Sequence, residues 1–415
     1  MDYIKLFKQE IIPAFGCTEP IALSYVSAEA VAALGEFPNK IEAKCSGNII
    51  KNVKSVVIPN SGGKKGLVYA VVLGAIIGNP EKKLEILESA TDADRERMNE
   101  LAASDFCTIS LAEGVANLYV EIKAESASHR VVVKLEGAHT NITYKEKDGE
   151  VLLDKPLETK RDLVGSEMSF DSIYEFAKTA DYSEIKDILI KEIEYNQKIS
   201  DEGLRNDYGS NIGKLLLDRY GKDDLENYCR ARAAAGSDAR MSGCALPVYI
   251  NSGSGNQGIT VSIPVITFAQ HMNSSEDELY RALIFANLIG LYQKSGIGKL
   301  SAYCGATSAS VAGVAGVAFL KNESKEVIAE TIVNGLAVLS GIVCDGAKPS
   351  CAGKISVGLE GAFLGYQQAR NKNSYKGGDG LVAATVDDTI RRIGIVAKEG
   401  MKETDIVILK EMIRD

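Results

Sequence analysis

The spacing of the apolar residues changes twice along this chain, and the change limits the folds that it can adopt. Residues 1–40 favour helix, because "IALSYVSAEAVAAL" follows the turn "GCTEP" and consists of good helix formers. Residues 41–168 contain short alternating runs typical of strands, among them "IEAKCSG", "VKSVVIP", "LYVEIKA" and "RVVVKLEG". From residue 169 to residue 415, apolar residues recur every three or four positions, as they do on helices.

These regions predict an α+β fold. A large, mainly helical domain is expected over residues 169–415, and a smaller domain with a mixed sheet over residues 41–168, inserted near the N-terminus. Turn signals such as "KDGE" between the last strand runs indicate antiparallel neighbours in that sheet. Residues 1–40 are expected to form a helical segment that packs on the large domain.

The composition is that of a globular protein and disfavours several classes of partner. Of the 415 residues, 45% are apolar, and the mean hydropathy of -0.03 is ordinary for a soluble chain. The net charge of -9 repels nucleic acid and anionic membranes. Residues 1–20 mix charges and prolines, which the apolar section of a signal peptide does not tolerate. We therefore expect a cytoplasmic protein that binds neither nucleic acid nor membrane.

Two apolar stretches are better explained as buried helices than as membrane spans. Residues 66–78, "GLVYAVVLGAIIG", are too few to cross a bilayer, which needs about 20 residues. Residues 302–320, "AYCGATSASVAGVAGVAFL", are long enough but consist mostly of Ala, Gly, Ser and Thr. Small residues let helices approach closely, so we expect this segment at the centre of the helical domain.

The chain has eight cysteines and no C-x-x-C pair: Cys17, Cys45, Cys107, Cys229, Cys244, Cys304, Cys344 and Cys351. Without an export signal a disulfide framework is not expected, and most of these thiols are explained as small buried side chains. Cys304, Cys344 and Cys351 differ, because each is embedded among glycines, with one no more than two positions away, in "AYCGAT", "IVCDGA" and "PSCAGK". A thiolate and free backbone N–H groups can converge at such positions.

These three cysteines leave two kinds of metal site open. A structural zinc site takes four ligands in closely spaced pairs, often with histidine, and the chain has only three histidines. Soft thiolates without histidine favour an iron-sulfur cluster, and three ligands on a four-iron cluster leave one iron open as a Lewis acid. Spacing alone does not decide between the two.

Four motifs together resemble a known enzyme family. "FGCTEPIAL", "IPNSGGKKG", "SGSGNQGI" and "CDGAKPSCA" occur in this order along essentially the whole chain. They are similar to motifs of the L-cysteine desulfidase family, which is related to the catalytic chain of the iron-sulfur L-serine dehydratases. The resemblance implies conversion of L-cysteine and water to pyruvate, ammonia and hydrogen sulfide without pyridoxal phosphate.

The resemblance also assigns the cluster ligands and a catalytic cysteine. It implies that Cys304, Cys344 and Cys351, forty and then seven positions apart, hold a [4Fe-4S] cluster whose remaining iron is open to substrate. A cysteine in the "GCTEP" turn is implicated in catalysis in that family, and Cys17 matches it. A thiol at a helix N-terminus is a candidate base for the Cα proton, because the helix dipole favours the thiolate. Cys17 as a fourth cluster ligand, or as a packing residue, remains an alternative.

Two glycine-rich loops are the candidate binding sites for the carboxylate and ammonium of the substrate. Free N–H groups and hydroxyls in "NSGG" and "SGSGNQG" suit an anion. An ordinary turn or linker is the alternative for each loop. With the residue after Cys17, the candidate substrate ligands are Thr18, Asn60, Ser61, Gly62, Ser254, Asn256 and Gln257.

Three other functions compete with the desulfidase. The loop "SGNQG" resembles the asparagine loop of pyridoxal-phosphate lyases, but a Schiff-base lysine upstream and a phosphate cup downstream are missing. An iron-sulfur L-serine dehydratase would use the same open iron for a hydroxyl, and a non-enzymatic redox or sulfur sensor would need the cluster alone. The glycine-rich loops and Cys17 favour turnover of the small molecule L-cysteine. The oligomeric state is left open, a homodimer included.

Overall fold

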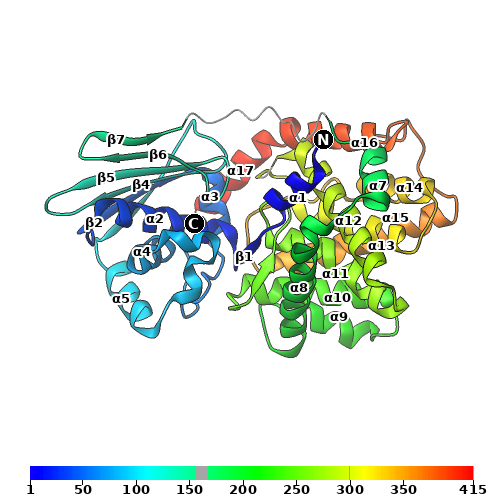
Figure 1. Ribbon diagram of the computed structural model, residues 1–415, viewed down its shortest axis with the longest axis horizontal. Helices are drawn as coiled ribbons and strands as arrows, with labels where there is room; N and C mark the ends of the chain where they lie inside the picture. Colours follow the sequence, from blue (N-terminus) through cyan, green and yellow to red (C-terminus); the bar gives the residue numbers. More distant parts are fainter. Residues whose placement is uncertain (156–166, 299, 415) are drawn as a thin grey trace.

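The computed structural model describes residues 1–155, 167–298 and 300–414. The chain forms two parts that lie side by side, one built on a sheet and a larger one built of helices (Figure 1). The chain begins in the helical part, enters the sheet part and then returns. The predicted α+β class, with a mixed-sheet unit inserted near the N-terminus, is confirmed.

The sheet has six strands in the order β3-β2-β4-β5-β6-β7. β2 runs parallel to β3, and every other neighbouring pair is antiparallel. Alternate residues of β2 face the core, and Ile41 lies opposite both Cys107 and Ala124. The strands are β2 (Lys40–Cys45), β3 (Cys107–Leu111), β4 (Tyr119–Glu125), β5 (Arg130–Glu136), β6 (Ile142–Lys147) and β7 (Glu150–Asp154).

One predicted strand is wrong. The run "VKSVVIP" was expected to be extended, but Val53 ends a helix and Val57 makes only an isolated bridge to Lys65. The chain reverses at once through a tight turn at residues 58–64, so it has no length over which to pair. Conversely, β3 was not predicted; it is short, and most of its side chains are exposed.

On one face of the sheet, α2 (Thr18–Leu34) and α4 (Leu67–Ile77) contact its strands, and the 3-10 helix η1 (Pro80–Ser89) and α5 (Asp92–Ala102) pack on these two helices. A further short helix, α3 (Gly47–Val53), contacts α2. α2 is buried on almost every side, between the sheet and α4. Gly74 permits this contact, because a Cβ there would lie 2.2 Å from the carbonyl oxygen of Ser24. The expected unit 1–40 is therefore divided: α1 (Tyr3–Glu10) lies on the helical part, and α2 packs on the sheet.

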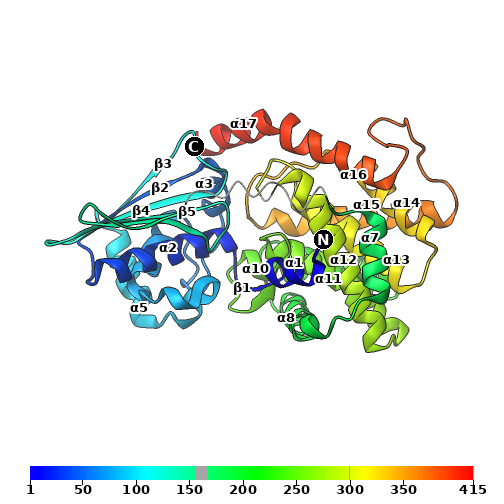
Figure 2. The ribbon, with the colours of Figure 1, turned by 45° about the horizontal axis from the view of Figure 1, so that its top comes forward.

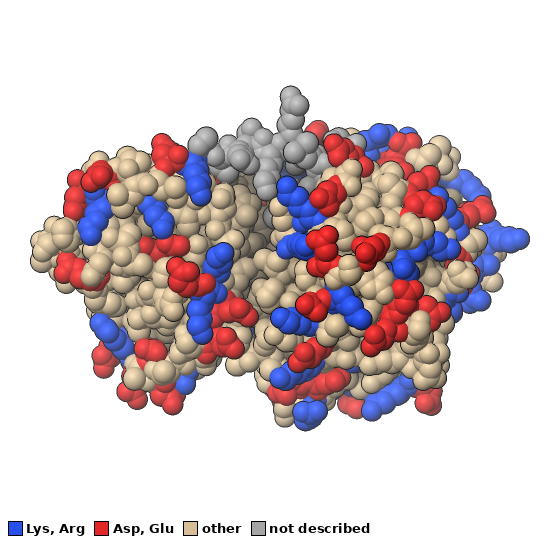
Figure 3. Space-filling view, in the orientation of Figure 1, with Lys and Arg blue, Asp and Glu red and all other residues tan. Residues whose placement is uncertain are grey.

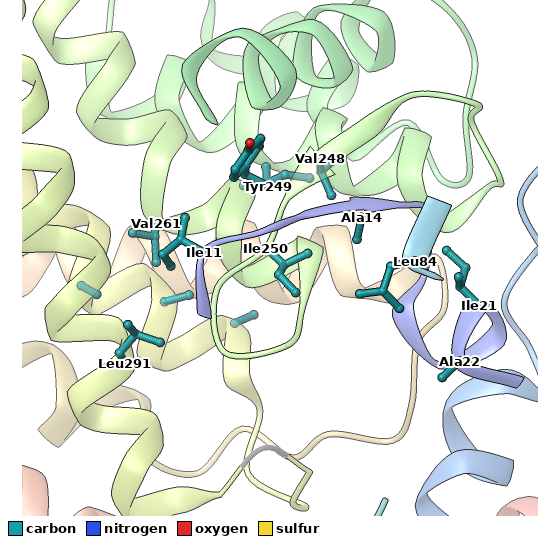
Figure 4. Close-up of a cluster of buried hydrophobic side chains, with 14 of the residues drawn as sticks. Ile11, Ala14, Ile21, Ala22, Leu84, Val248, Tyr249, Ile250, Val261 and Leu291 are labelled. Atoms are coloured by element: carbon teal, nitrogen blue, oxygen red, sulfur yellow. The ribbon is translucent and has the colours of Figure 1, made fainter. Parts of the chain in front are cut away.

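A two-stranded ribbon links the two parts. β1 (Pro13–Phe15) pairs antiparallel with β8 (Pro247–Tyr249), and Ala14 lies opposite Val248. Apolar side chains from both sides of the boundary surround this ribbon (Figure 4). The ribbon therefore anchors the turn that follows β1 to the helical part.

The helical part is centred on α13 (Gly305–Leu320), which contacts α11, α12, α14 and α15. Its small residues are buried along nearly its whole length, as predicted. Among the described residues, none of the helices combines the length and the apolar character that crossing a membrane requires. The other elements of this part are α7 (Phe170–Thr179), η2 (Ser183–Ile185), α8 (Lys186–Arg205), α9 (Ile212–Tyr220), α10 (Leu225–Met241), α11 (Gly255–Met272), α12 (Glu276–Ile297), α14 (Lys325–Leu339), α15 (Ser350–Arg370), α16 (Val386–Ile395) and η3 (Val396–Gly400).

The last helix, α17 (Lys402–Ile413), returns to the sheet part and packs on α3 (Figure 2). Asp405 forms a short ion pair with the buried Lys51 and accepts a hydrogen bond of 2.9 Å from Asn48 Nδ2. Gly47 leaves room for Leu409, whose Cδ2 would lie 2.2 Å from a Cβ at that position. The C-terminal helix thus fixes α3 from outside.

Candidate functional site

A pocket lies at the boundary of the two parts, and a hollow separates them on the surface (Figure 3). With its open mouth counted, it holds about 790 Å³ of empty space, which suits a small molecule. The sheet part, with the turn before it, contributes Cys17, Glu19, Asn48, Lys51, Asn52 and His139. The helical part contributes polar and thiol groups that include Arg240, Ser252, Ser254, Asn256, Gln257, Lys294, Ser301, Tyr303, Cys304, Cys344 and Cys351.

Among the helices that begin at this pocket are α2, α11, α13 and α15. Their capping positions are Cys17, Ser254, Cys304 and Pro349, and at none of them does a side chain cap the helix by a hydrogen bond. The first N–H groups of these helices are thus not satisfied by caps, and the positive ends of their dipoles meet here. Such an arrangement favours anionic groups in the pocket.

The three candidate cluster cysteines come together at one side of the pocket. Cys304 N donates to Ile342 O at 3.0 Å and Cys344 N to Ala302 O at 2.6 Å, so these two segments lie side by side. Cys351 lies in the first turn of α15, and the pocket reaches all three thiols. Burial raises the pKa of Cys304 to about 12, and the nearby Cys344 and Cys351 add to the rise.

These thiols fit a soft, anionic group better than a single ion. In the described part of the chain, no three His, Cys, Asp or Glu side chains surround one ion position. A structural zinc ion needs its sulfur ligands about 2.3 Å away, whereas the ligands of an iron-sulfur cluster bind different irons. The two helix N-termini at Cys304 and Cys351 also favour negative charge. The donor set and its surroundings therefore fit an iron-sulfur cluster.

Asp345 and two lysines fix the loop between Cys344 and Cys351. Lys348 and Lys354 both form short ion pairs with the Asp345 carboxylate, and Lys354 Nζ donates to Val343 O at 2.8 Å. Burial alone raises the pKa of Asp345, but the two ammonium groups outweigh it and hold the pKa at about 2. The net positive charge of this trio lies beside the thiols, where it would offset the negative charge of thiolate ligands.

Cys17 lies at the N-terminus of α2, as the sequence predicts, but in a different electrostatic setting. Burial raises its pKa well above the usual range, the charge of Glu19 adds to the rise, and Arg240 opposes it. Its Sγ donates to Glu19 Oε2 at 3.3 Å, as a protonated thiol does. It also packs in one small apolar cluster with Cys351. Its roles as base and as cluster ligand both stay predictions.

Glu19 is the centre of the polar network around Cys17. It accepts hydrogen bonds from Thr18 Oγ1 at 3.0 Å and from Asn52 Nδ2 at 3.1 Å. Burial alone would raise its pKa, but His139 and the Arg240 guanidinium lower it to about 2. Glu19 is therefore a charged carboxylate at neutral pH, in a pocket that it shares with several cations.

The turn before Cys17 depends on glycine at position 16. Gly16 has a φ of +82°, and a Cβ there would lie 1.9 Å from Pro59 Cγ. The rigid ring of Pro59 cannot move aside without shifting the turn at residues 58–64. Gly16 thus places Cys17 at the pocket through a backbone conformation that a residue with a side chain cannot adopt here.

Gly16→Ala is expected to destabilise the protein by roughly 2–5 kcal/mol, from backbone strain and overpacking together. Gly63→Ala is the matched control, because its φ of +84° is similar but a Cβ there meets no atom within 4 Å. The control should cost only about 1–2 kcal/mol. Chemical denaturation of both variants measures the difference, and equal losses would contradict the close approach to Pro59.

The loop before α11 brings three predicted substrate ligands to the pocket: Ser254, Asn256 and Gln257. Arg240 supports this loop, since its Nη1 donates to Asn256 Oδ1 at 3.2 Å and its Nε to Gly16 O at 3.1 Å. Gly305 makes room for Gln257, whose Cδ would lie 2.7 Å from a Cβ there.

Two further contacts hold this loop in place. Thr18 Oγ1 lies 2.9 Å from Gly253 O, so this predicted ligand joins α2 to the loop and does not line the pocket. Behind the loop, Asn251 Nδ2 donates to Asn287 Oδ1 at 2.9 Å, and Asn287 Nδ2 to the buried Glu192 at 3.0 Å. Burial raises the pKa of Glu192 to about 8.

The "NSGG" residues are not among those that line the pocket. Asn60 Nδ2 donates to Leu87 O and Ala90 O, each at 3.1 Å, so it braces the turn against η1. Ser61 Oγ donates to Ile58 O at 2.7 Å, inside its own turn, and Gly62 has a φ of +71° at the tip. Their role as substrate ligands stays a prediction that this placement does not support.

Six charged or titratable residues among those that line the pocket were missed by sequence reasoning: Glu19, Lys51, His139, Arg240, Lys294 and Tyr303. Glu19 stands inside the "GCTEP" motif, two residues after Cys17, and its nearness to Cys17 was the available signal. Nothing in the local sequence marks Lys51, His139 or Arg240, because each reaches the pocket through the packing of distant elements.

Comparisons with known proteins give the following matches. The family model of the serine dehydratase alpha chain matches residues 81–410. A UPF0597 protein of Finegoldia magna is 46% identical over 415 residues, covering 99% of both chains. A UPF0597 protein of Lachnoclostridium phytofermentans is 46% identical over 412 residues with the same coverage, and one of Bacteroides fragilis is 37% identical over 418 residues, covering 99% of this chain and 97% of the relative.

Proposed function

The chain belongs to the serine dehydratase alpha chain family, and from that premise we propose that it is an iron-sulfur L-cysteine desulfidase. It would convert L-cysteine and water to pyruvate, ammonia and hydrogen sulfide. The observation that supports this most is the pocket itself. It brings Cys304, Cys344 and Cys351 to the same cavity as Cys17 and the loop before α11.

Cys304, Cys344 and Cys351 would hold a [4Fe-4S] cluster. When bound, such a cluster supplies a Lewis-acidic iron that suits a sulfur leaving group. The chain's own residues hold the rest of the amino acid. Arg240 Nη2 donates to no described residue, and with Asn256, Gln257 and the N-terminus of α11 it faces the place for a carboxylate.

The reaction is a β-elimination. A base takes the proton from Cα, the electron pair of that bond forms the Cα=Cβ double bond, and the Cβ–S bond breaks with its pair on sulfur. We assign the base to Cys17, beside Glu19 at the start of α2. The aminoacrylate product tautomerises to an imine, which water hydrolyses to pyruvate and ammonium.

L-Serine is the second candidate substrate, and the name of the matching family favours it. The cysteine assignment rests on Cys17 and on the resemblance of the four sequence motifs to the desulfidases. Anaerobic purification with iron and sulfide analysis, followed by assays on L-cysteine and L-serine side by side, tests the proposal. If kcat/KM is higher for L-serine than for L-cysteine, L-serine is the substrate. If the protein contains no iron and acts on neither amino acid, it is not an iron-sulfur lyase.

Asn256→Ala is expected to raise KM about tenfold while the cluster spectrum stays intact, because it removes one carboxylate contact and the support for Arg240. Ser61→Ala is the comparison that tests the second loop. From its placement, Ser61→Ala should leave KM unchanged. Steady-state kinetics on both variants decide, and an equal rise in both would return "NSGG" to the site.

A further inference from the structure

The pocket contains one acidic side chain among the described residues that line it, and that residue is Glu19. Lys51, Arg240 and Lys294 are the cationic residues of this lining, whereas Glu19 is the one negatively charged partner that it offers an ammonium group. An α-amino acid carries both charges. The residues that bind its ammonium group therefore include Glu19, or the ammonium has no negatively charged partner in the pocket.

His139 stands beside Glu19 with an unused nitrogen. Its side chain is 7% exposed, and its Nε2 is buried without a hydrogen-bond partner in the described chain. Nε2 lies 3.8 Å from Glu19 Oε1, which is too far for a hydrogen bond. A buried polar nitrogen without a partner costs about 1–3 kcal/mol, so its presence here calls for a ligand.

The fold does not need the His139 side chain for the turn that carries it. That turn joins β5 to β6 and is closed by backbone bonds, with Asn141 Nδ2 donating to Glu136 O at 2.9 Å. The helical part instead makes room for the imidazole. Gly253 has a φ of +79°, and a Cβ there would lie 3.1 Å from His139 Cε1.

We propose that Glu19 and His139 together form the subsite for the α-ammonium group of the substrate. An ammonium has three N–H donors, and one placed between the two residues can donate to Glu19 Oε1 and His139 Nε2 at once. Glu19 Oε1 accepts from Asn52 Nδ2 and keeps a second lone pair for this bond. His139 accepts when its proton is on Nδ1.

This subsite rests on the proposed function, in which the substrate is an amino acid, and it identifies Glu19 and His139 as the residues that select for the α-ammonium group. The subsite lies in the sheet part, and Asn256 and Arg240, which face the carboxylate, lie in the helical part. The substrate would therefore span the two parts, and compounds without an α-ammonium would lose the contacts on one side.

The test compares L-cysteine with 3-mercaptopropionate, which lacks only the α-ammonium group. In Glu19→Gln, KM for L-cysteine should rise about 10- to 100-fold, the factor that follows from losing a hydrogen bond to a charged group. The inhibition constant of 3-mercaptopropionate should stay unchanged. Glu29→Gln is the matched control, because Glu29 lies on the same helix and pairs with Lys145 outside the pocket.

His139→Asn should weaken L-cysteine in the same selective way. His129→Asn is its control, because His129 is exposed just before the start of β5, and its Nδ1 lies 2.7 Å from Asp148 Oδ2. If Glu19 and His139 only brace the fold, both ligands will weaken equally and the melting temperature will fall, which would overturn the subsite. Equal affinity of the unmodified protein for the two ligands would overturn it without any variant.

An error in the proposed function can be distinguished from an error in the proposed subsite. If the anaerobically prepared protein turns over neither L-cysteine nor L-serine, calorimetric titration with L-cysteine and 3-mercaptopropionate still measures the preference for an ammonium. A preference that disappears in Glu19→Gln supports the subsite in a protein of another activity. Absence of binding by L-cysteine refutes the subsite as well.

Discussion

Replacing Cys304, Cys344 or Cys351 by alanine is expected to abolish both the visible absorbance of the cluster and the turnover of substrate. Each change removes one of three soft ligands, and two thiolates do not hold a four-iron cluster against loss of iron. The loss of activity should be complete in all three variants, because the leaving group then has no Lewis acid to stabilise it. Iron and sulfide analysis of anaerobically purified protein, with the absorption spectrum, measures the effect.

Cys229→Ala is the matched control for these variants. Cys229 also lies in the helical part, where it is fully buried, but its thiol faces Pro264 O at 3.9 Å and does not line the pocket. The control should keep its iron, its spectrum and its activity. An unmodified protein that contains stoichiometric zinc and no iron would contradict the cluster itself.

The candidate cluster cysteines could be proposed from the sequence because the pattern that marks each of them lies within a few neighbouring residues. Cys304 caps α13, Cys351 lies in the first turn of α15, and each has a glycine within two positions, so both features are visible in a short stretch of sequence. The same holds for Asn256 and Gln257 at the start of α11. Glycine next to a polar side chain before an apolar helix marks a helix N-terminus that can face a ligand.

The same signal was ambiguous at "NSGG", because a glycine-rich turn looks alike whether it binds an anion or only reverses the chain. What distinguishes the two is the bond from Asn60 to Leu87 and Ala90 on a later helix. Such contacts join segments far apart in the sequence, and no local pattern contains them. The parallel pairing of β3 with β2 was missed for the same reason.

The charged half of the pocket was also hidden from the sequence. Glu19, Asn52 and His139 come from α2, α3 and the β5–β6 turn, and they meet only because these segments, which are far apart in the sequence, pack together within the sheet part. The sheet part therefore has more than a structural role in this interpretation. It supplies the acidic side of a pocket whose candidate cluster cysteines and proposed carboxylate-binding groups lie in the helical part.

Cys17→Ser is expected to lower turnover by at least about 10²-fold, the usual loss when a general base is removed, while the cluster survives. Burial raises the pKa of Cys17, so its thiolate is a minor species in the ligand-free protein but a strong base once formed. A serine hydroxyl is much less acidic than a thiol and does not supply an equivalent base. The bond to Glu19 can be kept by the hydroxyl, so the fold of the turn should not change.

The alternative role of Cys17 as a fourth cluster ligand predicts a different outcome in the same variant. Cys17 and Cys351 pack in one apolar cluster, so the thiol is placed within reach of that side of the pocket. If Cys17 is a ligand, Cys17→Ser will lose iron or change the resting spectrum before any substrate is added. If Cys17 is the base, iron content and resting spectrum will match the unmodified protein, and anaerobic addition of L-cysteine will still change the spectrum. Loss of iron in parallel with loss of activity would therefore rule out the assignment of Cys17 as the base.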